Sequence, residues 1–157
     1  MARSAGGQKV VIRNRKARHE FEILDELETG LVLRGAEVKS LRTGKANFTD
    51  AYARIADGEL WLHNLHIPPY KSAHGFETLD PVRPRKLLLH RRELERLRVK
   101  VAERGFALIP LDIHFRHGFA KVTLALARGK KLHDKRQALK RADMKREVDR
   151  ALGTDRS

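Results

Sequence analysis

Alternation of apolar and polar residues runs through most of the first 128 residues, and this period of two constrains the fold more than any other feature. Residues 109–115 alternate cleanly, and so do residues 122–126. His117-Gly118 lies between the two runs and favours a tight turn. A period of two is typical of strands with one buried face, so the pattern predicts antiparallel pairs of half-buried strands.

The same pattern occurs earlier in the chain. Residues 52–55 and 60–65 flank Asp57-Gly58, and both turn positions tolerate the positive φ of a two-residue hairpin. Residues 21–27 also alternate, and we expect Glu28-Thr29-Gly30 to turn the chain into the next strand. The sequence therefore predicts six or seven short strands before residue 128.

Two stretches have helical spacing instead. In residues 90–104 the apolar positions recur at i, i+3 and i+7, and Gly105 then ends the run. Residues 36–42 form a shorter stretch that ends at Gly44. Short strands with a few helices favour a mainly β fold: a small closed antiparallel barrel of about six strands, similar to an oligonucleotide-binding (OB) fold, with helices outside. Closing the sheet removes its exposed edges.

Charge points to the class of partner. The chain has 34 Lys and Arg residues against 20 Asp and Glu residues, a net charge of +14. Such an excess favours a polyanionic partner. The absence of cysteine excludes disulfides, thiolate catalysis and cysteine-ligated metals. Because we see no long apolar run and no apolar signal region, we expect a soluble cytoplasmic protein without membrane contact.

Composition changes near Arg128. Residues 129–157 hold ten basic and five acidic residues and few large apolar ones. Burial of so few apolar side chains cannot offset the cost of ordering the backbone, about 1–2 kcal/mol per residue. We therefore expect a disordered N-terminus over residues 1–8, a folded domain over 9–128 and a basic tail over 129–157.

Catalytic motifs are not found. The chain has no G-x-S-x-G motif. Gly129-Lys130-Lys131 resembles the end of a phosphate loop, but it lacks both the first glycine and the Ser or Thr of that motif. Glu37 and Asp50 flank apolar residues, yet a cap or a salt bridge explains each of them more simply. We expect no catalytic residue and no cofactor.

Histidine spacing invites a metal-binding interpretation. His63-x-x-His66 and His114-x-x-His117 have ligand-like separations. On a regular strand, however, residues three apart point to opposite faces. No carboxylates cluster beside either pair, so we expect satisfied or surface histidines and no metal site.

Basic runs favour RNA. One run covers residues 14–19, a second is Arg83-x-Arg85-Lys86, and Lys39, Arg42 and Lys45 add more. Each run alone would be an ordinary solvated surface, but three runs and a basic tail indicate contact with nucleic acid. Aromatic residues are few, so stacking of single strands is a weak option. Recognition of a structured RNA through its backbone and shape fits better.

Several long motifs resemble the SsrA-binding protein family, also called small protein B. The resemblance covers residues 9 to about 137. Its segments are NRKARHEF (14–21), ETGLVLRGAEVKSLRTGKANFTDAYARI (28–55), HIPPY (66–70), DPVRPRKLLLHRRE (80–93) and GKKLHDKR (129–136).

This resemblance implies a six-stranded OB-like barrel with three helices and no enzymatic activity. It implies binding to the tRNA-like domain of transfer-messenger RNA and delivery of that RNA to 70S ribosomes stalled without a stop codon. The stalled peptide then receives a degradation tag, a process called trans-translation. Elongation factor Tu and alanyl-tRNA synthetase are implied as indirect partners through the same RNA. The tail is implied to become helical in the decoding centre and the mRNA channel.

Site residues follow from the resemblance, position by position. Asn14, Glu28, Leu88 and Lys121 resemble the contacts to the RNA elbow, and Arg15, Lys16, Lys39 and Arg42 would contact neighbouring phosphates. The tail residues implied at the decoding centre and in the mRNA channel are Arg128, Lys130, Lys131, His133, Asp134, Lys135 and Arg136. Two departures from the family pattern stand out: Pro68, and His114 where an aromatic residue such as Tyr is common. We expect neither to touch a residue assigned to RNA.

Two other classes of function stay open at this point. A general ribosome-associated protein would use the same basic surface without preferring one RNA. An RNA-modifying enzyme would need a cofactor loop or an acid–base pair, and the sequence offers neither.

Overall fold

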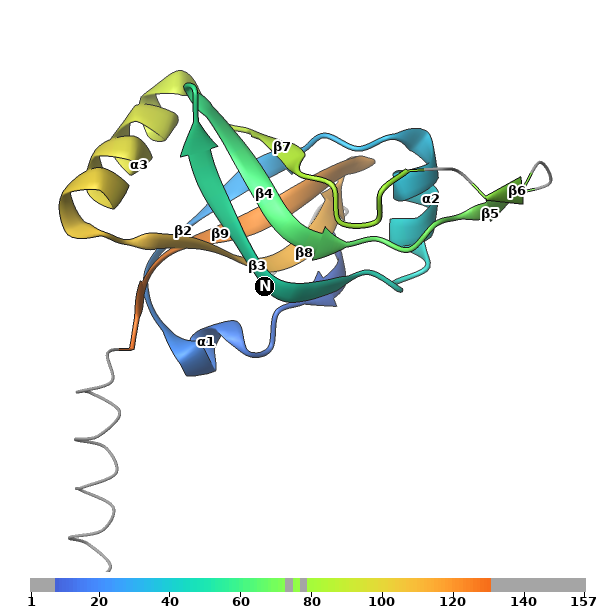
Figure 1. The fold of residues 1–157 in the computed structure, drawn as a ribbon, viewed down its shortest axis with the longest axis horizontal. Coiled ribbons are helices and arrows are strands. Elements are labelled where there is room, and N and C mark those ends of the chain that lie inside the picture. Colours follow the sequence, from blue (N-terminus) through green and yellow to red (C-terminus); the bar gives the residue numbers. More distant parts are fainter. Residues whose placement is uncertain (1–7, 73–74, 77–78, 131–157) are drawn as a thin grey trace, which may run out of the picture.

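Seven strands of the computed structural model, which describes residues 8–72, 75–76 and 79–130, form one antiparallel sheet that closes into a barrel (Figure 1). Their bounds are β1 (Lys9–Arg13), β2 (Phe21–Leu31), β3 (Asn47–Ala56), β4 (Glu59–His66), β7 (Arg85–Leu88), β8 (Ala107–Arg116) and β9 (Phe119–Gly129). The closed ring is β8-β3-β4-β7-β2-β9, because β9 pairs back onto β8, and β1 adds to β8 outside that ring. A separate small hairpin joins β5 (Lys71–Ser72) to β6 (Gly75–Phe76). The expected barrel of about six strands is confirmed.

Both predicted hairpin turns are present. Asp57 and Gly58 have φ values of 53° and 75°, and they join β3 to β4. His117 and Gly118 have φ values of 52° and 82°, and they join β8 to β9. Positive φ at both central residues matches the right-handed twist of the paired strands, which explains why these dipeptides form the turns.

The turn predicted at Glu28-Thr29-Gly30 is wrong. These residues lie inside β2, which runs without a break to Leu31. Glu28 pairs with Thr123 and Gly30 pairs with Lys121, both on β9. Glycine permits a turn but does not require one. Here, pairing with strands on both sides holds Gly30 in an extended conformation.

Three helices pack around the barrel: α1 (Ala17–Glu20), α2 (Gly35–Arg42) and α3 (Arg91–Arg104). Figure 1 shows α2 and α3 at opposite ends of the barrel. Gly105 ends α3 with φ 66°, and Gly44 follows α2 with φ 74°, as expected for left-handed helix ends. Spacing did not predict α1, because four residues are too few to show a helical period. Among the described helices, none is long and apolar enough to cross a membrane.

The core has two parts. The larger fills the barrel, and its fully buried side chains include Leu41, Leu60, Leu62, Leu65, Ile113, Val122 and Leu124. The smaller lies outside the ring, where Ala17 of α1 packs with Ile109 and Leu111 of β8 and with Ala125 and Ala127 of β9. This part of β8 and β9 is therefore buried on both faces.

A buried ion pair joins α2 to β7. Arg85 is 0% exposed and donates from Nε to Oε2 of Glu37 at 2.8 Å. Its remaining nitrogens donate to the carbonyls of Leu65 and Pro81, so the buried guanidinium is well satisfied. Arg83 also donates to Glu37, 3.0 Å from Nε to Oε2. A buried charge needs this kind of full partnering to be tolerated.

This ion pair changes the interpretation of the second basic run. Arg83 and Arg85 are held by Glu37, and Lys86 pairs with Glu59. Arg85 is buried, so its use as part of a cationic surface for RNA, expected from the sequence, is wrong. The distance along the chain hides the pairing, since Glu37 precedes Arg85 by 48 residues. Glu37 is a structural carboxylate, in line with the simpler of the two interpretations of this residue.

Strand β9 continues to Gly129, one residue beyond the predicted boundary, and Lys130 then donates its backbone N–H to the carbonyl of Glu20 at 3.2 Å. This bond fixes the end of the barrel strand against α1. The expectations for residues 1–7 and 131–157 lie outside the described residues.

Candidate nucleic-acid interface

Leu88 and Lys121 lie in one row across the outer face of the barrel, with Gly30 between them. Gly30 pairs with Leu88 of β7 on one side and with Lys121 of β9 on the other. A Cβ at Gly30 would lie 3.2 Å from the Cβ of Leu88, tighter than ordinary contact. The missing side chain lets Leu88 lie over the sheet while it stays 53% exposed. The row presents an apolar side chain and a cation about two strand spacings apart, or about 10 Å.

Glu28 lies in the next row, and one oxygen of its carboxylate makes both of its ion pairs. Oε2 lies 2.7 Å from Nε2 of His114 and 3.0 Å from a guanidinium nitrogen of Arg116. The side chain remains 36% exposed. Among the described residues none donates a hydrogen bond to Oε1, so this oxygen can accept one from a partner.

The environment of Glu28 favours the ionised carboxylate. Partial burial pushes its pKa up, but the hydrogen bond from His114 and the neighbouring positive charges together outweigh this, and the pKa lies below its ordinary value. The charges of Arg116 and Lys121 act in the same direction. Glu28 lies inside a continuous strand, so its carboxylate caps no turn.

A chain of hydrogen bonds runs from Glu28 into the sheet. His114 is 1% exposed, and its Nδ1 lies 2.8 Å from Oδ1 of Asp112. Thr123 donates its hydroxyl to the same oxygen at 2.9 Å. The expectation that the departure at His114 touches no residue assigned to RNA is therefore wrong. The two partners are 86 positions apart in the chain, so no local pattern joins them.

Asn14, Arg15 and Lys16 lie elsewhere, in the connection between β1 and α1. Asn14 donates from Nδ2 to the carbonyl of Pro110 at 2.8 Å, so its amide nitrogen is engaged within the barrel. Arg15 and Lys16 are exposed. The structure thus separates these three residues from the row that holds Leu88 and Lys121.

Lys39 and Arg42 form a third location on α2. The Lys39 Nζ lies 5.8 Å from the centre of the Tyr70 ring, and the Arg42 guanidinium lies 4.1 Å from the centre of the Phe115 ring. Both contacts are within the range of cation–π attraction, and both side chains remain exposed. The eight residues assigned to the barrel therefore occupy three places on its surface.

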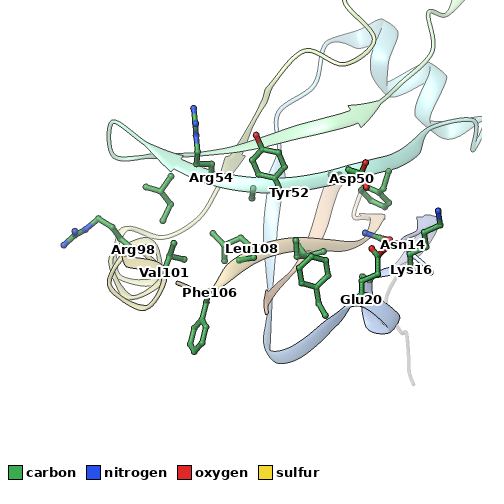
Figure 2. A pocket seen from close by; sticks show the side chains of 18 of the residues that line it. Asn14, Lys16, Glu20, Asp50, Tyr52, Arg54, Arg98, Val101, Phe106 and Leu108 are labelled. Atoms are coloured by element: carbon green, nitrogen blue, oxygen red, sulfur yellow. The ribbon is translucent and has the colours of Figure 1, made fainter. Parts of the chain in front are cut away.

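A groove of about 910 Å³ opens between β3, α1 and α3 (Figure 2). Val101, Phe106 and Leu108 give it apolar walls near α3, and Asn14 and Lys16 lie at its α1 end. Its charged lining residues are Lys16, Glu20, Asp50, Arg54, Asp57 and Arg98. Three cations and three anions balance, so the groove offers a polyanion little net attraction.

Two of the seven assigned tail residues fall within the described residues. Arg128 pairs with Glu22 across β2 and β9, and Lys130 is exposed. The other five, Lys131, His133, Asp134, Lys135 and Arg136, lie outside the described residues.

Two expectations about the histidine pairs are wrong. Carboxylates do lie beside His114, because Glu28 and Asp112 contact its ring. The second concerns the faces of His63 and His66. The inward residues of β4 are Leu60, Leu62 and Leu65, so strict alternation breaks at Asn64, which has φ 65°. The claim that His63 and His66 must face opposite sides therefore fails. Within residues 8–72, 75–76 and 79–130, no three His, Asp or Glu side chains are grouped to hold a metal ion.

The sequence analysis missed Arg116 and Asp112. It also missed the role of Gly30, whose lack of a side chain makes room for Leu88. Asp112, His114 and Arg116 share the outer face of β8, and alternation alone could have grouped them. Their pairing with Glu28 depends on β9 lying between β8 and β2, which the sequence does not specify.

Comparison with known proteins decides the family. The family model described as SmpB protein matches residues 11–154. The chain belongs to the SmpB family. The resemblance noted from the sequence is thereby confirmed.

Relatives within the SmpB family are similar along nearly their whole length. The SsrA-binding protein of Desulforudis audaxviator is 56% identical over 144 residues, 92% of this chain and 94% of the relative. That of Acidothermus cellulolyticus is 54% identical over 153 residues, 98% of this chain and 95% of the relative. A solved chain described as "tmRNA-SmpB: a journey to the center of the bacterial ribosome" is 52% identical, with a TM-score of 0.67, and covers 83% of this chain and 95% of its own.

Proposed function

We propose that this protein binds the tRNA-like domain of transfer-messenger RNA (tmRNA) and delivers it to stalled ribosomes for trans-translation. The observation that carries the proposal is the match in sequence and fold to the SmpB chain described with tmRNA and the bacterial ribosome. The net charge of +14 suits both RNA partners. We place the protein in the cytoplasm, and we infer that it acts by binding and catalyses no reaction.

The outer face of β7, β2 and β9 is the proposed contact to the RNA elbow. Lys121 supplies a cation for a phosphate, and Leu88 supplies an exposed apolar side chain that can pack on a base or a ribose. Glu28 supplies Oε1 as an acceptor for a base amino group or a ribose hydroxyl. An anion is unfavourable beside a polyanion unless it accepts a specific donor, so Glu28 supports recognition rather than general attraction.

The other assigned residues take supporting roles in this proposal. Asn14 makes a further contact to the RNA elbow from its separate place on the barrel, and Arg15, Lys16, Lys39 and Arg42 contact neighbouring phosphates. We assign residues 9–128 to the RNA-binding barrel and 129–157 to a tail that enters the decoding centre and the mRNA channel and becomes helical there. Elongation factor Tu and alanyl-tRNA synthetase meet the protein only through the shared RNA.

The direct test compares two RNAs at physiological salt. We expect the protein to bind a tRNA-like domain of tmRNA much more tightly than a ribosomal RNA fragment of equal length. Sequencing of the RNA that copurifies with the protein from its host should recover tmRNA. Equal affinity for both RNAs would favour a general ribosome-associated protein instead.

Lys121→Ala is expected to weaken binding to every RNA tested. Loss of one phosphate contact should make the salt dependence of the affinity shallower by up to about 1 unit of slope. The control is Lys100→Ala, an exposed cation on α3, which should change neither quantity much. Titrations over a salt series measure the affinity and the slope of its salt dependence. An unchanged slope for Lys121→Ala would show that Lys121 does not contact the RNA.

Glu28→Gln is expected to weaken binding to the tRNA-like RNA selectively. A charge-assisted hydrogen bond contributes about 1.5–3 kcal/mol, which corresponds to about 10- to 150-fold in affinity. Removal of the negative charge should at the same time improve binding to unrelated RNA. Glu95→Gln, which removes a salt-bridged carboxylate on α3, is the control. If Glu28→Gln binds the tRNA-like RNA as well as the unchanged protein does, Glu28 makes no specific contact.

A further inference from the structure

His114 lies buried between two carboxylates on the outer side of the barrel. Its Nδ1 is 2.8 Å from Asp112 and its Nε2 is 2.7 Å from Glu28. A carboxylate only accepts hydrogen bonds, so each contact needs a proton on the ring nitrogen. The contact that matters here is the one at Nε2, where the ring donates a hydrogen bond to Oε2 of Glu28.

We propose that His114 is a positioning residue for RNA recognition, because it holds Oε2 of Glu28 and so turns Oε1 toward the RNA. The inference rests on the proposed function, in which Glu28 contacts the RNA. It concerns this chain in particular, because the sequence resemblance has an aromatic residue such as Tyr at this position.

Asp112 fixes the His114 ring on the side opposite Glu28. Asp112 binds Nδ1 with the oxygen that also accepts the Thr123 hydroxyl, so the acceptor does not swing freely. With Nδ1 held, the ring plane directs Nε2 at Glu28. A glutamate side chain otherwise rotates about three bonds, and fixing it before the RNA arrives removes an ordering cost from the binding step.

The surrounding charges match this role. The charged groups that face the ring are Asp112 and Arg116 on its own strand, Glu28 on β2 and Lys121 on β9, while Val10 is its partner on β1. Arg116 binds the same Oε2 at 3.0 Å. The hydrogen bond from His114 and the ion pair with Arg116 both engage Oε2, which leaves Oε1 as the proposed acceptor for RNA.

The test uses a pair of variants that differ in one donor. In His114→Gln the amide nitrogen takes the place of Nε2 and still donates to Glu28, whereas His114→Met has similar length and no donor. We expect His114→Met to lower affinity for the tRNA-like RNA about tenfold, and His114→Gln to keep it within about threefold. The carboxyl pKa of Glu28, followed by carbon NMR, should rise more in His114→Met than in His114→Gln. A purely structural role would lower the melting temperature of both variants and leave the affinity of the folded proteins equal.

A double variant separates this inference from the proposed function. If His114 acts through Glu28, His114→Met should cause no further loss of affinity when Glu28 is already Gln. If Glu28→Gln alone leaves the affinity unchanged, the proposed contact of Glu28 fails. If Glu28→Gln weakens binding but His114→Met does not, only the positioning role is wrong.

Nitrogen NMR of the unchanged protein guards against variants that do not fold. Nε2 of His114 should carry a proton that exchanges slowly with water, as its hydrogen bond to Glu28 requires. An Nε2 that carries no proton would overturn the inference.

Discussion

A chain that ends at Lys130 is expected to lose ribosome rescue and to keep its affinity for the tRNA-like RNA. The truncation preserves every strand of the barrel, the row of Leu88 and Lys121, and the bond from Lys130 to Glu20. The removed residues 131–157 hold nine of the 34 Lys and Arg residues. In the proposed function these cations enter the mRNA channel, where the barrel cannot replace them.

Three measurements test whether the barrel binds the RNA and residues 131–157 are needed for rescue. Tagging of a peptide on a ribosome stalled without a stop codon should fall to background. The melting temperature and the affinity for the tRNA-like RNA should change little. The matched control replaces residues 131–157 with a neutral Gly-Ser segment of the same length and should fail in rescue in the same way. A large loss of RNA affinity on truncation would place the binding site in the tail.

Glu37→Ala is expected to destabilise the barrel by about 3–5 kcal/mol, because it leaves the guanidinium of Arg85 buried without its anion. Arg85 is 0% exposed, and Glu37 also binds Arg83 and the backbone N–H of Arg34. The control is Glu59→Ala, which removes the partner of Lys86 at the surface. An exposed pair contributes about 0–1 kcal/mol, so the control should change stability little. Denaturant unfolding of both variants measures the difference, and equal losses would contradict the role given to Glu37.

The same ion pair gives an acid dependence. Burial raises the pKa of Glu37, but hydrogen bonds from Arg83, Arg34 and Arg85 outweigh this, and the folded-state pKa lies below its ordinary value. A lowered pKa stabilises the fold above the unfolded-state value, about 4.3, and this contribution is lost as the pH falls through the folded-state value. Unfolding curves from neutral to acid pH should therefore show a steeper loss for the unchanged protein than for Glu37→Ala.

Local chemistry explains what the sequence predicted well. Asp57-Gly58 and His117-Gly118 form the predicted turns, because both residues of each dipeptide tolerate the positive φ that they adopt here. Gly105 ends α3 for the same local reason. Short alternating runs between such signals were enough to predict a closed antiparallel barrel.

Features that depend on distant partners were missed or predicted wrongly. Gly30 is extended because strands lie on both sides of it, and a local pattern cannot show that. Arg85 is buried because Glu37 reaches it from α2, so a basic run in the sequence is not a basic surface in the fold. His114 meets Glu28 only because of the strand order. The resemblance therefore assigned Glu28 to the site, but the sequence did not show that His114 contacts it.

The continuity of β9 has a mechanical consequence. Lys121 lies near its start, and the strand ends at Gly129, eight residues and about 26 Å further along. Strands β2 and β8 clamp it on both sides over nearly this whole length. In the proposed function, the strand therefore sets a fixed distance between the RNA contact at Lys121 and Gly129, where the basic tail begins.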